Sequence, residues 1–545
     1  MESEQPTNFP SLINYIDRLE NRIKRLEEHL KLEPLVFGAS SPPVANGKKY
    51  KESKDIEMQI GQFWLAKVGV IALLTGIVFI LTLPFDGLSQ IIPLMIGYLI
   101  AAALAGLSVL FKKSFEVLSQ YLMGGALIVL YVSTLRLYYF SADPLLTDKT
   151  IVIALALLVI SFNFFISIRR NSIYLTGTIL ALAFLTAMLI ETALIEFILI
   201  LALAIFTAFL KEKYSWRTLL TYGLIITYFT HFLWFINNPL AGNPIKITTG
   251  ISINLPFILL YFLVFTYSNY LSIKKEKENN LISLNILLNC LSAFGLFFII
   301  SLLSAKESLF QYHLIMSILF IALSYIFWVK FRSKFSSFFY SITGFTALSV
   351  AIIAGVEQPD FFIILCWQSL LVLAFALLYK SKFITVANFI MYLLIFIVYL
   401  GFSGFGNITI SFGIVALLSA RITNWQKNRL EIRTEFIRHT YLFLAFIIFP
   451  IALFNMVPNE YVSIAWIILS VIYYAIGMLL NNIKYRWLAL YTLLITAVYL
   501  LVIGIQESDP TYRIISFLSL GLVLLLVSLV YSRARLKRPI ESLKK

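Results

Sequence analysis

Four ionisable side chains lie near the ends of predicted membrane spans that face away from the cytoplasm. They are Arg136, Glu191, Glu196 and His231. Ionisable residues within membrane segments point to function by default, and this set could bind a polar head group or relay a proton. Alternatively, each is an interfacial side chain that reaches water on its own. The absence of charged residues at mid-bilayer favours this second interpretation.

Three amides, Asn285, Asn289 and Gln368, are less clearly interfacial. They could line a polar path through the membrane, and interhelical hydrogen bonds explain them equally well. The four histidines are scattered without the spacing of metal ligands, and neither cysteine has a neighbouring base. We therefore expect no metal, no cofactor and no catalytic residue of a known signature.

The composition requires that these residues be held by helices in a lipid bilayer. Of the 545 residues, 60% are hydrophobic and only 13% are charged, with a mean hydropathy of +0.88. Soluble domains carry about 25% charged residues. Apolar runs of about twenty residues predict transmembrane helices. The fold class is therefore all-α, a polytopic bundle of about eighteen spans.

The expected spans follow one another closely along the chain. They are Phe63–Leu83, Gln90–Leu110, Val117–Tyr138, Thr150–Ile168, Ser172–Ile190, Thr192–Leu210, Leu219–Ile236, Thr249–Leu271, Leu281–Leu303, Leu309–Val329, Ser336–Gly355, Phe361–Tyr379, Phe383–Leu400, Ile408–Ala420, Thr440–Met456, Tyr461–Leu480, Trp487–Ile505 and Tyr512–Val530. Ile408–Ala420 is short for a full span and could be re-entrant. The domains are then 1–32, 33–60, 61–531 and 532–545.

The breaks between spans alternate in charge and set the orientation. Basic breaks include Arg169 with Arg170, Lys380 with Lys382, and the tail from Arg533 to Lys545. The intervening breaks carry acids such as Glu191 and Glu460. The positive-inside rule then places both termini in the cytoplasm. Unbroken alternation favours an even number of spans, and hence a crossing by Ile408–Ala420. The net charge of +15 follows from this orientation, so we expect no nucleic acid as partner.

The N-terminal segment carries a heptad pattern of apolar residues. After Phe9 the positions are Leu12, Ile16, Leu19, Ile23, Leu26 and Leu30. Alternating steps of three and four predict a coiled coil, which would form a homodimer or dock a partner helix. The alternative is an amphipathic helix on the membrane surface. A tether rich in Pro and Lys follows, over residues 33–60.

Several helices that leave the cytoplasm place Tyr ahead of Gly, as at Tyr121 and Gly124, or Tyr340 and Gly344. This recurrence would fit a duplicated helical hairpin. The alternative is that interfacial Tyr and small packing residues recur in any polytopic bundle.

Two segments carry a family resemblance. Lys67–Leu81 resembles the first-helix signature of a bacterial membrane-protein family catalogued as domain of unknown function 2339, and Leu122–Tyr131 resembles its Gly-rich third helix. The resemblance implies an N-terminal coiled coil, a Pro-rich tether and many spans in a bacterial cytoplasmic (inner) membrane. Leu185–Glu191 departs from the Pro-containing run typical of the family. The resemblance implies no activity.

Three hypotheses for function follow. The first is transport or flipping of an amphiphilic cell-envelope substrate, favoured by the many spans and short loops. The second is a non-catalytic scaffold or assembly factor acting through the coiled coil. The third is an intramembrane transferase using Glu191 or Glu196. In each case membrane lipids are expected partners.

Overall fold

In the computed structural model 87% of the described residues are helical, and the described part contains no strand. The structure describes residues 21, 25, 65–82, 91–140, 144–248, 253–403, 408–425, 435–502, 514–525 and 527. The predicted heptad residues of the coiled coil, and the tail from 532 onward, lie outside these ranges.

Every predicted span coincides with one helix of the described chain, eighteen in all. The helices are α3 (Leu65–Thr82), α4 (Ile91–Phe111), α5 (Glu116–Leu135), α6 (Lys149–Arg169), α7 (Ile173–Met188), α8 (Ala193–Tyr214), α9 (Arg217–Phe235), α10 (Asn254–Lys275), α11 (Asn280–Ser304), α12 (Leu309–Phe331), α13 (Lys334–Gly355), α14 (Phe361–Leu378), α15 (Lys382–Ser403), α16 (Thr409–Trp425), α18 (Glu435–Met456), α19 (Val462–Leu479), α20 (Ile483–Val502) and the segment Ile514–Leu525.

Fourteen of these helices are long and apolar enough to cross a membrane. The others are α3, α7, α16 and the segment Ile514–Leu525, whose described apolar stretches are shorter. Helix α16 extends five residues beyond the predicted Ile408–Ala420, to Trp425. Its 17 residues span roughly 26 Å at about 1.5 Å each, slightly less than a hydrocarbon core of about 30 Å. That it crosses, and that the spans total eighteen, stay predictions.

The chain forms two compact units. The first comprises Met1–Ile80 and Leu107–Leu122, and the second comprises Leu81–Gly106 and Met123–Lys545. Within the first unit, Ser108 Oγ donates to the carbonyl oxygen of Ser119 at 2.6 Å, and Ser119 Oγ donates back to that of Ser108 at 2.6 Å. This reciprocal pair joins the end of α4 to the beginning of α5.

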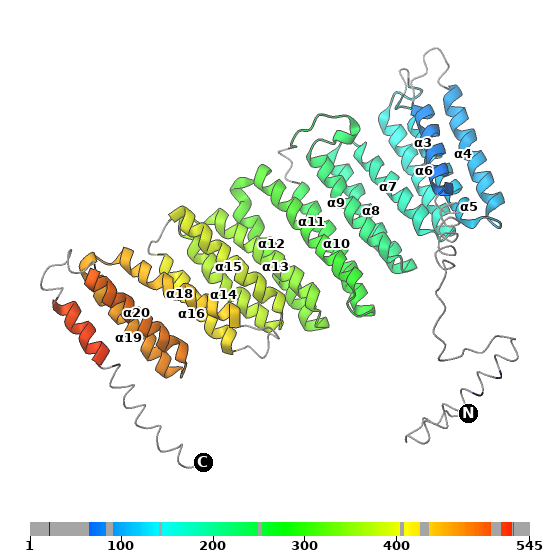
Figure 1. The fold of residues 1–545 in the computed structure, drawn as a ribbon. Helices are drawn as coiled ribbons and strands as arrows, with labels where there is room; N and C mark the ends of the chain where they lie inside the picture. Colours follow the sequence, from blue (N-terminus) through cyan, green and yellow to red (C-terminus); the bar gives the residue numbers. More distant parts are fainter. Residues whose placement is uncertain are drawn as a thin grey trace, which may run out of the picture. The chain divides into compact units, whose positions relative to one another are not determined.

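In the second unit, consecutive helices pair as hairpins (Figure 1). The pairs with the closest contact are α6 with α7, α8 with α9, α10 with α11, α12 with α13, α14 with α15, α16 with α18, and α19 with α20. Neighbouring hairpins also touch, for example through α7 and α9, α8 and α10, or α14 and α16. Each hairpin therefore packs mainly on its neighbours along the chain.

Three of the hairpin turns, those after α6, α14 and α19, share one backbone design. Asn171, Lys380 and Asn481 each adopt a positive φ of 47–50° just after a helix. The following residue donates its N–H to the carbonyl five residues back, as Ser172 does to Ser167 at 3.2 Å. The side chain of that residue then caps the next helix, as Ser172 Oγ does for the N–H of Leu175. This is a Schellman ending joined directly to an N-cap.

The hairpin turns all coincide with the basic breaks of the sequence, and acids there link one turn to the next. Lys275 Nζ bonds Glu212 at 2.6 Å, between the turns after α10 and α8. Glu278 accepts from Ser333 Oγ and from Ser336 Oγ, both at 2.6 Å. Sequence reasoning assigned these loops to orientation alone.

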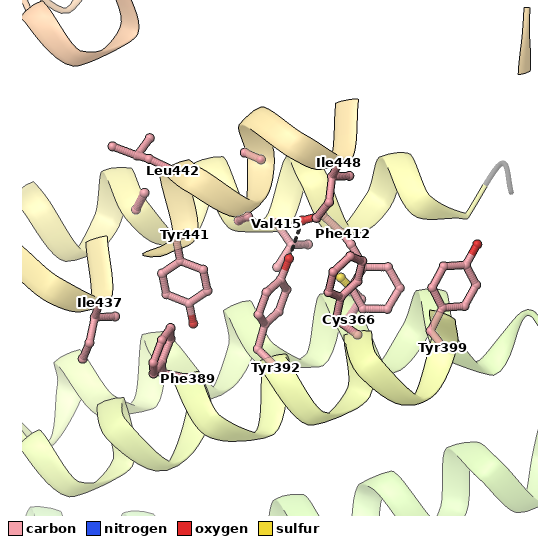
Figure 2. Close-up of a cluster of buried hydrophobic side chains, with 14 of the residues drawn as sticks. Cys366, Phe389, Tyr392, Tyr399, Phe412, Val415, Ile437, Tyr441, Leu442 and Ile448 are labelled. Carbon is pink, nitrogen blue, oxygen red and sulfur yellow. Dashed lines mark hydrogen bonds between the residues drawn. The ribbon is translucent and has the colours of Figure 1, made fainter. Parts of the chain in front are cut away.

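The interior between hairpins is rich in aromatic residues. Figure 2 shows one such cluster, where helices α14, α15, α16 and α18 meet. The ring of Tyr399 stacks on Phe412 with centroids 5.1 Å apart, and Tyr392 donates its hydroxyl to the Phe412 carbonyl at 2.7 Å. Outward faces carry exposed apolar residues such as Leu99 and Phe443, 71% and 61% exposed. Such surfaces are typical of helices that face lipid or a protein partner.

Candidate functional site

A cavity of about 680 Å³ lies at the end of the hairpins that carries the acidic breaks. We call it the Glu196 pocket. It is bounded by the end of α5, the start of α6, the α7–α8 connection, the first turn of α8, and the segment that follows α9. Its lining residues include Tyr139, Lys149, Glu191, Glu196, Trp234 and Asn238. Two of the four predicted rim residues, Glu191 and Glu196, therefore share one cavity.

Glu196 is the buried acid of this pocket. It occupies the first turn of α8 and is only 3% exposed. Its Oε1 atom has no hydrogen-bond partner in the described part of the protein. The positive end of the helix dipole favours a carboxylate here. A buried carboxyl oxygen without a donor is nevertheless costly, so the pocket is complementary to a ligand that donates to it.

Lys149 contributes a cation to the lining of the Glu196 pocket. Lys149 Nζ lies 2.8 Å from Glu191 Oε1, and the Glu191 side chain is 82% exposed. The hydrogen bond from Lys149 lowers the pKa of Glu191, so this carboxylate is ionised at neutral pH. Exposed ion pairs contribute little to stability because water and salt screen them. Lys149 can therefore exchange Glu191 for an anionic ligand group at small cost.

A polar residue on the opposite wall adds a second unpaired acceptor. Asn238 adopts a left-handed conformation with φ of 51°, which Asn tolerates better than most residues. Its Nδ2 donates to the Met188 carbonyl at 2.7 Å, which fixes the side chain, while its Oδ1 has no partner in the described ranges. Tyr139 lines the same cavity, and burial raises the pKa of its hydroxyl, which stays protonated.

His231 and Arg136 do not line the cavity. The His231 ring is fully buried and stacks on Phe197 at 4.6 Å, with Trp234 5.7 Å away. His231 therefore lies behind the pocket wall, and neither ring nitrogen has a partner in the described part. Arg136 is 2% exposed, and its Nη1 donates to the carbonyl of Leu81. Arg136 thus binds a backbone carbonyl in the last turn of α3, where a cation is favourable.

The amides of α11 act as interhelical links. Asn289 accepts from the Tyr228 hydroxyl at 2.8 Å and donates to the Phe262 carbonyl and to Thr266 Oγ1, both at 3.1 Å. Asn285 accepts from Thr221 at 2.6 Å. These bonds satisfy the Asn289 amide through α9 and α10.

Gln368 belongs to a different place, a small chamber of about 60 Å³ among α13, α14 and α15. Its Nε2 donates to the Phe345 carbonyl at 2.8 Å and to Ser349 Oγ at 3.0 Å. The chamber also holds Ser369 and Asn388, each with a buried polar atom that lacks a partner in the described residues. About two waters fit such a volume. Gln368 is thus not brought together with the two asparagines.

Sequence reasoning did not select Lys149, Asn238 or Trp234 for the site. A signal existed for Lys149, because it is one of the few bases in an otherwise acidic set of breaks. For Asn238 and Trp234 the sequence offers none, since their role depends on how the segment after α9 folds back. The described residues contain no group of three His, Cys, Asp or Glu side chains placed to hold a metal ion.

Comparison with models of known protein families, with curated proteins and with solved structures finds no match to this chain.

Proposed function

We propose that this chain is a multi-pass protein of the bacterial cytoplasmic membrane that transports or flips an amphiphile, with both termini in the cytoplasm. The proposal rests on one observation. Glu196 lines a cavity of about 680 Å³, and its buried Oε1 atom has no hydrogen-bond donor in the described part of the protein. The family suggested by Lys67–Leu81 is part of the same proposal.

The chemistry of the pocket indicates the head group. A primary ammonium on the ligand would donate to Glu196 and neutralise its charge. Lys149 would leave Glu191 and bind a phosphate on the same head group. Exposed apolar residues at the edge, such as Leu240 at 67%, would guide the acyl chains into the bilayer. A zwitterionic aminophospholipid meets all three conditions.

Native mass spectrometry of the purified full chain tests the binding step. Phosphatidylethanolamine should bind more tightly than phosphatidylglycerol, because only the former carries the ammonium. Glu196→Gln keeps the shape and removes the charge, and we expect at least tenfold weaker phosphatidylethanolamine binding, as charge-assisted hydrogen bonds are worth about 1.5–3 kcal/mol. Glu307→Gln, at an exposed acid on the same end of the hairpins, is the matched control.

A flipping assay in proteoliposomes tests the transport step, with phosphatidylethanolamine labelled on its acyl chain and quenched from outside. The wild type should equilibrate the label between leaflets, and Glu196→Gln should slow this markedly. If the chain binds the lipid but does not flip it, the transport hypothesis fails and the hypothesis of a lipid-bound scaffold remains. Equal binding by wild type and Glu196→Gln would contradict the proposal at its first step. A transferase using Glu191 or Glu196 would instead yield a covalently altered lipid, visible in the same spectra.

A further inference from the structure

A second cavity, of about 520 Å³, lies between α18 and α20, far along the chain from the Glu196 pocket. We call it the α18–α20 groove. Its walls are apolar and aromatic, and include Phe443, Phe446, Trp487, Tyr491 and Leu494. One end holds His439 and Lys484. The groove thus combines a long apolar channel with a cationic end.

The apolar part has the length of one lipid leaflet. From Lys484 to Ile495 is eleven helical positions, or roughly 17 Å at about 1.5 Å per residue. That is about half of a hydrocarbon core of about 30 Å. The walls stay open to the outside, since Phe443 and Leu494 are both 61% exposed. A single acyl chain can therefore lie along the groove without entering the interior.

Aromatic rings shape the middle of the groove. The rings of Trp487 and Tyr491 are 5.6 Å apart, and Phe446 lies 6.1 Å from Tyr491. Trp and Tyr favour the level at which lipid head groups meet the acyl chains. Trp487 lies about one turn and Tyr491 about two turns beyond Lys484, which places a head group beside that lysine.

The cationic end carries more cations than acids. Lys484 Nζ is hydrogen-bonded to His439 Nε2, and Arg438 acts electrostatically on both. Glu435 is the acid that acts on them. Neither Lys484 nor Arg438 forms an ion pair with a carboxylate in the part of the chain that the structure describes. Elsewhere at the basic end, Lys275 and Arg217 each have a carboxylate partner.

We propose that the α18–α20 groove binds an anionic phospholipid. The phosphate lies at Lys484 and His439, and one acyl chain follows the aromatic wall toward Ile495. The excess of cations over acids at the cationic end selects an anionic head group. A zwitterionic lipid places its ammonium against Lys484 and is disfavoured there.

Native mass spectrometry with added phosphatidylglycerol or phosphatidylcholine tests this site on the purified full chain. The wild type should retain phosphatidylglycerol preferentially. Lys484→Ala should lower the affinity for phosphatidylglycerol about fivefold, because one cation near an anionic lipid contributes about 1 kcal/mol. The same change should leave the affinity for phosphatidylcholine unaltered. Lys484→Arg should restore most of the binding. Lys382→Ala, at the exposed basic start of α15, is the matched control and should have no effect.

Quenching by brominated acyl chains provides an independent reading at the groove. The difference in tryptophan-fluorescence quenching between wild type and Trp487→Phe reports contact of the acyl chain with Trp487. Brominated phosphatidylglycerol should give a larger difference than brominated phosphatidylcholine. Equal effects of Lys484→Ala and Lys382→Ala, or quenching at Trp487 without head-group preference, would overturn the proposal. A second copy of the chain in the groove would appear as a dimer that excludes the lipid, which would also overturn it.

Discussion

Individual polar residues in this chain differ in whether their hydrogen bonds are complete. Asn289 has three partners from two neighbouring helices, whereas Glu196 has a buried oxygen with none in the described ranges. Both looked alike in the sequence, as single polar residues in apolar runs. The difference separates a residue that joins helices from one that awaits a ligand, and it predicts opposite effects of mutation.

Replacement of Asn289 with Leu should destabilise the helix bundle. The change removes the acceptor of the Tyr228 hydroxyl and one of the two donors to Thr266 Oγ1, which still accepts from Tyr340. Interhelical hydrogen bonds in membranes are worth about 0.6 kcal/mol each on average. We expect a loss of about 1–3 kcal/mol, including the orphaned groups, seen as a lower melting temperature in detergent. Asn455→Leu, at an exposed asparagine of α18, is the control. In contrast, Glu196→Gln should leave the melting temperature unchanged or raise it. If Asn289→Leu melted like the wild type, the hydrogen bonds of this residue would not support the bundle.

At the scale of helices, the repeated unit is the hairpin, and its signature lies in the turn. The Tyr–Gly pattern suggested by the sequence also includes Tyr174 and Gly177. It does not mark equivalent places, because Tyr340 is fully buried while Tyr174 is 79% exposed. One turn design does recur in three hairpins, with a left-handed residue followed by a capping Ser or Asn. Asn and Lys at these positions give no strong sequence signal, since Gly is the residue expected there.

Glycines at helix contacts fix how closely two helices of a hairpin approach. A Cβ at Gly344 would lie 2.8 Å from Ile321 Cγ1 and 3.1 Å from the Ile321 backbone nitrogen, so α13 cannot keep its distance to α12. We expect Gly344→Ala to cost about 1–3 kcal/mol, the range for overpacking. Gly295→Ala meets nothing within 4 Å and should be neutral or stabilising, because Ala favours helix. Thermal melting of the two variants side by side makes the comparison; a higher melting temperature for Gly344→Ala would refute the close contact.

For the whole molecule, helices were predictable and the pocket was not. Apolar length alone located every α-helix that the structure describes between residues 65 and 525, since a membrane span has few alternatives to a helix. The basic breaks coincide with the hairpin turns, although the charge pattern was used to predict orientation alone. The Glu196 pocket depends on Lys149, Glu191 and Asn238 meeting from three separate connections. No pattern within one segment encodes that meeting.

The orientation of the helices after α16 depends on whether α16 crosses the membrane, and cysteine labelling tests this crossing. Six helices separate Glu307 from Glu460, namely α12 to α16 and α18, so both residues should face outward if all six cross. Without a crossing by α16, five remain and Glu460 would face the cytoplasm. Cys290 and Cys366 are buried, which keeps background labelling low. We expect Glu307→Cys and Glu460→Cys to react with a membrane-impermeant maleimide in intact cells, and Glu276→Cys to react only after permeabilisation. Protection of Glu460→Cys in intact cells, with Glu307→Cys labelled, would make α16 re-entrant and invert the hairpins that follow, including the leaflet that faces the α18–α20 groove.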